Sequence, residues 1–223
     1  MKNLILNKRV LNPISLLILM SIAMPIAFNT WSAMLNNFVV EKAAFTGVEI
    51  GILQSLREVP GFLSFTLIFV LLIIKEQTFA VFSLALLGLG VCLTGFFPTV
   101  YGLYFTTIVM SIGFHYFEAV KQSLSLQWLS KEEAPIVLGR LLAVGSLTSL
   151  IVYGCLWMLL EFFQLPYWIN FVIAGGICIL LAIVMYCGFP SFPSKVEQNQ
   201  NLVLRKRYWL YYVLTFLSGA RRQ

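Results

Sequence analysis

Ionisable side chains stand in two places inside long apolar stretches of the sequence, where they could do chemistry. The first group consists of His115, Glu118, Lys121 and Gln122. Residues three or four apart lie on the same face of an α-helix, so we expect these side chains to form one stripe. A histidine and a glutamate on such a stripe can relay protons, because imidazole exchanges its proton near neutral pH. The alternative is that Glu118 and Lys121 form an internal ion pair that only neutralises itself.

The second group is the adjacent pair Arg57 and Glu58. Neighbouring residues on a helix point about 100° apart, which predicts a separate partner for each side chain. The pair could form a gate on the outer side of the membrane, contact the substrate, or extend its charges to the membrane surface. Arg140 follows Glu132 and Glu133 in the sequence, and it could likewise form a gate salt bridge or extend its guanidinium to the interface.

Polar residues also follow Pro25 within the first apolar stretch, among them Asn29 and Trp31. A proline bends a helix because it removes a backbone donor, and bent helices expose the amides that build solute sites in membrane proteins. We therefore expect Asn29 and Trp31 to contact a solute or a coupling ion. The alternative is that Trp31 anchors the helix at the membrane interface.

Other kinds of catalytic or metal site have no pattern in the sequence. The cysteines at positions 92, 155, 178 and 187 form no Cys-x-x-Cys pair, and none stands at metal-ligand spacing from the single histidine. A metal site needs three or four ligands, and nucleotide binding needs a glycine-rich phosphate loop. We therefore expect no catalytic residue, no metal and no cofactor, and the chain is not predicted to be an enzyme.

The composition indicates that the helices holding these side chains lie in lipid. Of the 223 residues, 60% are hydrophobic and only 11% are charged. Soluble proteins contain about 25% charged residues, because they must cover a surface in water. The formal net charge of +6 comes from basic residues between apolar stretches. This distribution places them at lipid headgroups and argues against nucleic acid as a partner.

Six apolar stretches are long enough to cross a bilayer, since a spanning helix needs about 20 residues. They cover residues 13–36, 48–74, 78–97, 101–129, 136–160 and 168–188. The predicted fold is an all-α membrane protein with a six-helix transmembrane bundle at 1–188 and a cytoplasmic basic loop at 189–207. At 208–223 we expect the start of a seventh transmembrane helix, which is truncated because its apolar part is too short to span.

Lysine and arginine are distributed asymmetrically between the two sides of this predicted bundle. The loops opposite the N-terminus contain only Lys42. Because cytoplasmic loops are enriched in basic residues, we expect a multi-pass protein of the cell (inner) membrane with a cytoplasmic N-terminus. The basic residues predicted on the cytoplasmic side are Lys2, Lys8, Arg9, Lys75, Lys131, Lys195, Arg205, Lys206 and Arg207.

The sequence resembles the major facilitator superfamily, whose members consist of two six-helix halves joined by a cytoplasmic loop. The segment from Thr46 to Gln54 resembles that family's entry into its second helix, and the segment from Gly139 to Ser146 resembles the start of its fifth. The resemblance covers the whole chain, as the N-terminal half with the start of helix seven. The family's signature loop between helices two and three is replaced by Lys75, Glu76 and Gln77, and no substrate is implied.

The resemblance implies secondary active transport of a small solute by alternating access, coupled to an ion or a proton. The expected partners are a small-molecule substrate, the lipid bilayer, and a missing C-terminal half or a second copy of the chain. The alternative is a membrane scaffold that does not transport, or an inactive half of a transporter. The residues expected to contact substrate or coupling ion are His115, Glu118, Lys121, Gln122, Asn29 and Trp31, and those expected to gate are Arg57, Glu58 and Arg140.

Overall fold

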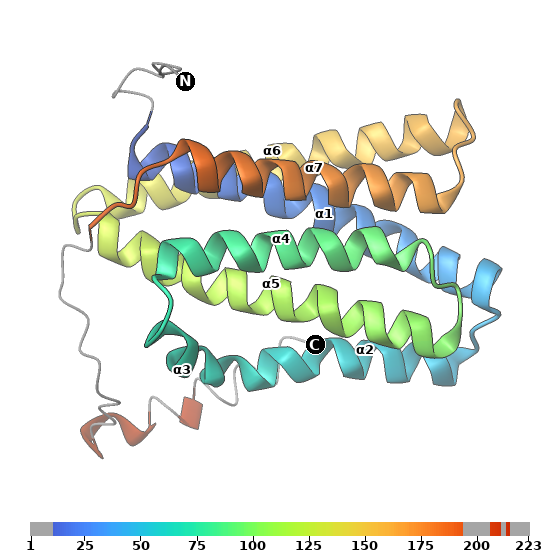
Figure 1. The fold of residues 1–223 in the computed structure, drawn as a ribbon, viewed down its shortest axis with the longest axis horizontal. Coiled ribbons are helices and arrows are strands. Elements are labelled where there is room, and N and C mark those ends of the chain that lie inside the picture. Colours follow the sequence, from blue (N-terminus) through green and yellow to red (C-terminus); the bar gives the residue numbers. More distant parts are fainter. Residues whose placement is uncertain (1–10, 194–205, 211–212, 215–223) are drawn as a thin grey trace. The chain divides into compact units, whose positions relative to one another are not determined.

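The computed structural model describes residues 11–193, 206–210 and 213–214, and no strand occurs within these ranges. The predicted all-α class is therefore confirmed for the described part of the chain. Figure 1 shows the helices as a bundle. They are α1 (Pro13–Ala43), α2 (Gly47–Phe62), α3 (Leu67–Leu71), α4 (Glu76–Thr94), α5 (Val100–Trp128), α6 (Ala134–Glu161) and α7 (Tyr167–Gly188).

The described residues belong to two units, one ending at Pro193 and the other beginning at Ser194. In the second unit a short 3₁₀ helix, η2, covers Lys206–Tyr208. The predicted seventh helix at 208–223 lies mostly outside the described residues, as does most of the predicted basic loop at 189–207. Basic residues used to predict the orientation that also lie outside them are Lys2, Lys8, Arg9, Lys195 and Arg205.

Several helices begin at a polar residue that caps them. Asn12 Oδ1 accepts the backbone N–H of Ser15 at 2.9 Å at the start of α1. At the start of α2, Thr46 forms a capping box, in which the Thr46 N–H donates to Glu49 Oε2 at 2.8 Å. Such caps satisfy N–H groups that have no partner within the helix, and the cost of losing one is about 1 kcal/mol.

The second predicted helix is not continuous, and the prediction of one helix over 48–74 is wrong in this respect. Helix α2 ends at Phe62, and the 3₁₀ helix η1 (Leu63–Thr66) connects it to the short α3. Pro60 stands within the last turn of α2, two residues before the helix ends, and as a proline it donates no backbone hydrogen bond there. Helix α1, by contrast, runs unbroken through Pro25 and seven residues past the predicted end at residue 36.

Four helices of the described chain, α1, α4, α6 and α7, are long and apolar enough to cross a membrane. They indicate a membrane-embedded protein. Helix α2 is only 16 residues long, and neither α2 nor α5 belongs to this group of four. Helix α6 leaves large apolar side chains such as Leu147 and Leu150 exposed, which is the surface that lipid would cover.

Each long helix of the first unit packs against a small number of others. Helix α1 packs on α6 and α7, α5 packs on α2 and α4, and α4 packs on α7. The starts of α1, α4 and α6 lie at the same end as the ends of α5 and α7, so successive long helices alternate in direction (Figure 1). Helices α1 and α5 thus have equivalent positions, each between one peripheral helix and one helix of the α4–α7 pair.

Glycines allow α4 to approach α5 and α7 closely. A Cβ atom built on Gly113 of α5 would overlap the backbone of Leu87 on α4. Likewise, a Cβ on Gly88 of α4 would stand 2.7 Å from the carbonyl oxygen of Gly175 on α7. Because lipid supplies no hydrophobic drive for helix association, close contact between small residues stabilises such pairs through van der Waals packing.

This packing predicts different effects of the same substitution at two neighbouring glycines of α7. A Cβ on Gly175 would lie 2.6 Å from Cys92 Sγ and 2.8 Å from Cys92 N, whereas a Cβ on Gly176 would meet nothing within 4 Å. We expect Gly175→Ala to destabilise the protein by about 1–3 kcal/mol, the usual cost of overpacking. Thermal unfolding in detergent should show a lowered midpoint for Gly175→Ala and an unchanged midpoint for Gly176→Ala. Equal midpoints for the two variants would contradict the α4–α7 contact.

Candidate functional site

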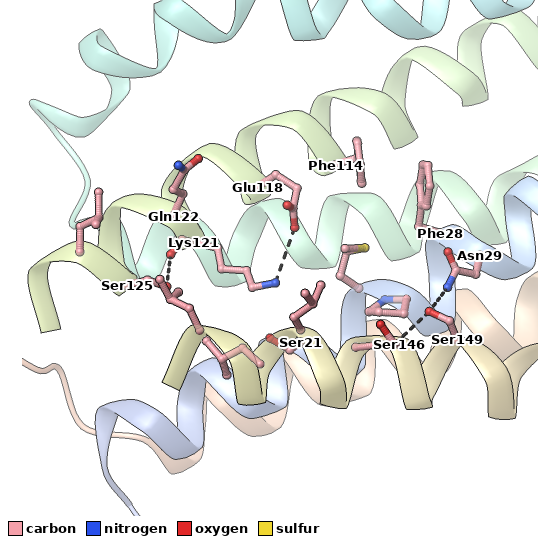
Figure 2. A pocket seen from close by; sticks show the side chains of 17 residues that line it. Ser21, Phe28, Asn29, Phe114, Glu118, Lys121, Gln122, Ser125, Ser146 and Ser149 are labelled. Atoms are coloured by element: carbon pink, nitrogen blue, oxygen red, sulfur yellow. Dashed lines mark hydrogen bonds and ion pairs between the residues drawn. The ribbon is translucent and has the colours of Figure 1, made fainter. Parts of the chain in front are cut away.

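A cavity of about 600 Å³ lies between α1, α5 and α6. Figure 2 shows the side chains of Glu118, Lys121 and Gln122 on α5, with the serines of α1 and α6 across from them. Among the described residues, Glu118 and Lys121 are the only charged ones that line it, so this part of the lining has no net charge. The neutral polar residues lining it are Asn29, Gln122, Ser21, Ser125, Ser146 and Ser149. The structure thus brings together four of the predicted substrate residues: Asn29, Glu118, Lys121 and Gln122.

The two charged side chains of the cavity are paired without a hydrogen bond. Lys121 Nζ lies 3.7 Å from Glu118 Oε1, and the two side chains keep 19% and 42% of their surface exposed. Glu118 Oε1 itself is buried and accepts no hydrogen bond from the described residues. Lys121 Nζ also lies 5.7 Å from the ring centroid of Phe117, a cation–π contact. The pair is therefore loosely held, and both charges keep the capacity to bind a further group.

One hydrogen bond joins the α1 and α6 walls of the cavity. Asn29 Nδ2 donates to Ser149 Oγ at 2.7 Å, and Ser149 Oγ donates to the Gly145 carbonyl at 2.9 Å. In addition, Ser21 Oγ is buried in the α1 wall and has no hydrogen-bond partner among the residues that the structure describes. A buried hydroxyl without a partner costs about 1–3 kcal/mol, so a polar ligand that reaches Ser21 would recover free energy.

The rest of the lining is apolar. At one end of the cavity the rings of Phe28 and Phe114 stack, with centroids 4.2 Å apart and planes inclined by 14° (Figure 2). Such stacked pairs contribute about 0.5–1.5 kcal/mol beyond their burial. The other apolar residues lining the cavity are Met24, Pro25, Leu126, Leu138, Leu141 and Leu142.

Five of the predicted site residues do not line this cavity: Trp31, Arg140, His115, and the adjacent Arg57 and Glu58. Trp31 is fully buried behind it, with its ring centroid 6.3 Å from that of Phe28, and its Nε1 has no hydrogen-bond partner in the described part of the chain. Arg140 is exposed on α6. His115, finally, faces α2 instead of the cavity.

A second cluster of charged groups lies where α2 packs on α5. Arg57 donates from Nε and Nη2 to Glu58 Oε1, at 2.9 Å and 2.7 Å. His115 Nε2 lies 3.8 Å from the other Glu58 oxygen, Oε2. On α5, Ser111 Oγ donates to the carbonyl of Arg57. The prediction of separate partners for Arg57 and Glu58 is wrong, because the long arginine side chain bends back to its neighbour.

The close packing of α2 on α5 explains why His115 belongs to this second cluster. A Cβ atom on Gly61 would lie 2.7 Å from His115 Cε1, so the imidazole rests directly on the glycine. The stripe that lines the cavity includes Phe114, Glu118 and Lys121. His115 follows Phe114 directly and is therefore turned about 100° away from that stripe, toward α2. His115 and Glu118 thus do not form the single pair that their spacing predicted.

Sequence reasoning missed several contributors to the cavity, among them Phe28, Ser146 and Ser149. Ser146 and Ser149 follow Leu142 at helical spacing, so a cavity-facing stripe on α6 was visible in the sequence. Serine alone does not signal a site, however, because it also occurs at helix contacts in membranes. Nothing in the sequence marked Phe28 as a cavity residue, since aromatic residues are common throughout this sequence.

Within the described residues, no group of three or more His, Cys, Asp or Glu side chains could hold a metal ion.

Comparison with known proteins identifies no relative: no family model, no curated protein and no solved structure matches the chain.

The second cluster predicts an interaction that strengthens as His115 gains a proton. Imidazole is charged only when protonated, so its attraction to the Glu58 carboxylate should be stronger at about pH 5 than at about pH 8. A double-mutant cycle with Glu58→Gln and His115→Gln, measured by unfolding in detergent, should give a coupling of about 0.5–3 kcal/mol. That coupling should decrease as the pH rises.

A cycle with Glu118→Gln and His115→Gln provides the matched comparison. The structure places Glu118 in the cavity and His115 against α2, so this cycle should show a smaller coupling and a weaker pH dependence. If instead His115 couples more strongly to Glu118 than to Glu58, our assignment of the imidazole to the second cluster is wrong.

Proposed function

We propose that this protein moves a small solute across a membrane through the cavity between α1, α5 and α6, by alternating access and coupled to a proton or another ion. The observation that supports this most strongly is the Glu118–Lys121 pair, which faces a cavity of about 600 Å³ inside a bundle of apolar helices. A charged residue within a membrane costs about 2.5–3.5 kcal/mol on insertion scales, and such residues usually line a solute or ion path.

The packing of the helices supports the resemblance to one half of a major facilitator. The main packing contacts show an internal symmetry. If α1 is exchanged with α5, α2 with α6 and α4 with α7, the α1–α6 contact becomes the α5–α2 contact, and the α1–α7 contact becomes the α5–α4 contact. Each half of a major facilitator contains two repeats of three helices related in this way. The proposal therefore counts α2 with α3, and α5, as two further membrane spans. It also places the N-terminus in the cytoplasm of an inner-membrane protein.

In this proposal the residues have different functions according to their position. Glu118, Lys121, Gln122 and Asn29 contact the solute, since they line the cavity. The cluster of Arg57, Glu58 and His115 lies outside the cavity and is a candidate for the coupling proton or for a gate. The second half of the solute path comes from a further six-helix unit, either a C-terminal half or a second copy of the chain.

The second candidate function is a membrane scaffold, or a half-transporter without activity of its own. The observation that favours it is that α1, α5 and α6 form the whole described lining of the cavity. Alternating access requires two units that rock against each other around a central site. If the protein is a scaffold, water and solutes do not pass through the cavity in any conformation of the protein.

Thiol labelling tests whether the cavity is a watery passage. Ser146 lines the cavity, whereas Ser83 is buried on α4 and does not line it. In a background in which Cys92, Cys155, Cys178 and Cys187 are replaced by alanine, we expect a water-soluble thiol reagent to modify Ser146→Cys in membrane vesicles. Ser83→Cys should remain unmodified.

A flux measurement then separates transport from a scaffold function. Vesicles containing the protein should take up at least one compound from an isotope-labelled pool of amino acids, sugars and organic acids. Ser146→Trp should abolish that uptake by filling the cavity, while Gly139→Trp should not, because Gly139 is on the same helix and faces open space. If the thiol at position 146 stays unmodified and uptake equals that of protein-free vesicles, the scaffold function is favoured and the transport proposal fails.

A further inference from the structure

The balance of charge in the cavity restricts what it can bind. Its lining contains one carboxylate, on Glu118, and one ammonium group, on Lys121. A solute with a net charge would therefore bring in a charge that the lining does not balance. The solute that fits this lining has no net charge.

A solute without net charge is either a neutral molecule, such as a sugar, or a zwitterion. The geometry of the Glu118–Lys121 pair favours the zwitterion. The two side chains are 3.7 Å apart at their nearest charged atoms, beyond the usual hydrogen-bond distance of about 2.7–3.2 Å. Glu118 Oε1 is buried and receives no hydrogen bond from the described residues. A donor ammonium group would satisfy this oxygen, and a carboxylate could then replace Glu118 as the partner of Lys121. A zwitterion supplies both groups at once.

The opposite wall argues against a sugar. A polyhydroxylated solute needs a hydrogen-bonding partner for most of its hydroxyl groups, because an unpaired buried hydroxyl is costly. On α6 the lining offers the hydroxyls of Ser146 and Ser149, of which Ser149 is already bonded to Asn29 and to the Gly145 carbonyl. The leucines of this wall, Leu138, Leu141 and Leu142, offer no such partner, and the stacked rings of Phe28 and Phe114 close one end. These surfaces fit a hydrocarbon or aromatic side chain.

We propose that the cavity binds an amino-acid-like zwitterion with an apolar side chain. Its ammonium group contacts Glu118, its carboxylate contacts Lys121, and its side chain lies on the apolar surface that includes Phe28 and Phe114. The hydroxyl of Ser21, buried in the lining without a partner, can bond to the polar part of the ligand. The inference rests on the proposed function, since it names the class of solute that the same cavity takes.

Three ligands that differ only in their charged groups test this inference. L-Phenylalanine has both groups, 2-phenylethylamine has only the ammonium group, and 3-phenylpropionate has only the carboxylate. Binding to the purified protein in detergent, measured by calorimetry, should be at least about tenfold tighter for L-phenylalanine than for either analogue, which corresponds to about 1.4 kcal/mol.

Charge-neutralising variants should change this preference in opposite directions. Glu118→Gln gives the lining a net positive charge, so it should weaken L-phenylalanine binding about tenfold and favour 3-phenylpropionate over 2-phenylethylamine. Lys121→Gln should reverse the order of the two analogues. Glu132→Gln removes a carboxylate that is exposed and does not line the cavity, so its binding should equal that of the unmodified protein.

The outcomes separate this inference from the proposed function. If the three ligands bind equally well, or if none binds, the zwitterion inference is overturned, whereas labelling at position 146 and flux of some other solute would still support transport. If the preference for L-phenylalanine holds but vesicles take up no solute, the binding site stands and the transport proposal fails. If the order of the two analogues is the same in Glu118→Gln and Lys121→Gln, the assignment of the two charges is wrong.

Discussion

A charge held away from water needs a partner, and this requirement governs how α1, α5 and α6 are arranged. Glu118 and Lys121 stand on one face of α5. Helix α6 packs on α1 and hardly touches α5, which leaves the space into which both side chains extend. If α6 closed against α5, the pair would meet leucines, and the desolvation of two charges would cost several kcal/mol. The separation of α5 from α6 and the presence of the ion pair therefore require each other.

The glycine contacts explain why that space does not collapse. Helix α4 approaches α5 through Gly113 and α7 through Gly88 and Gly175, so close that a methyl group would not fit. These contacts fix α4, α5 and α7 as one packed layer, to which α1 is added. Helix α6 is attached to this layer mainly through α1, where Asn29 donates to Ser149. Helix α2 is attached mainly through α5. The two peripheral helices, α2 and α6, therefore each pack mainly on a single neighbouring helix.

Much of this arrangement could be predicted from the sequence, because the length of an apolar stretch and the helical period are local properties. They placed the helices, and they placed Glu118, Lys121 and Gln122 on one stripe. What they could not predict is which neighbour each face meets. His115 shares the spacing of the stripe but is turned toward Gly61, and only the glycine makes room for it. Trp31 was predicted to contact a solute, yet its side chain is fully buried. The prediction failed because a residue's type does not reveal which side of a helix packs against its neighbours.

The position of His115 gives α5 a distinctive property. One face of this helix meets the Arg57–Glu58 pair through His115, and the next face, three residues on, meets the cavity through Glu118. A proton bound at the first face changes the attraction between α2 and α5, because it adds a charge 3.8 Å from the Glu58 carboxylate. A solute bound at the second face changes the charges between α5 and α6. If transport is coupled to protons, both events act on the same turn of one helix, and no longer path through the bundle is needed to connect them.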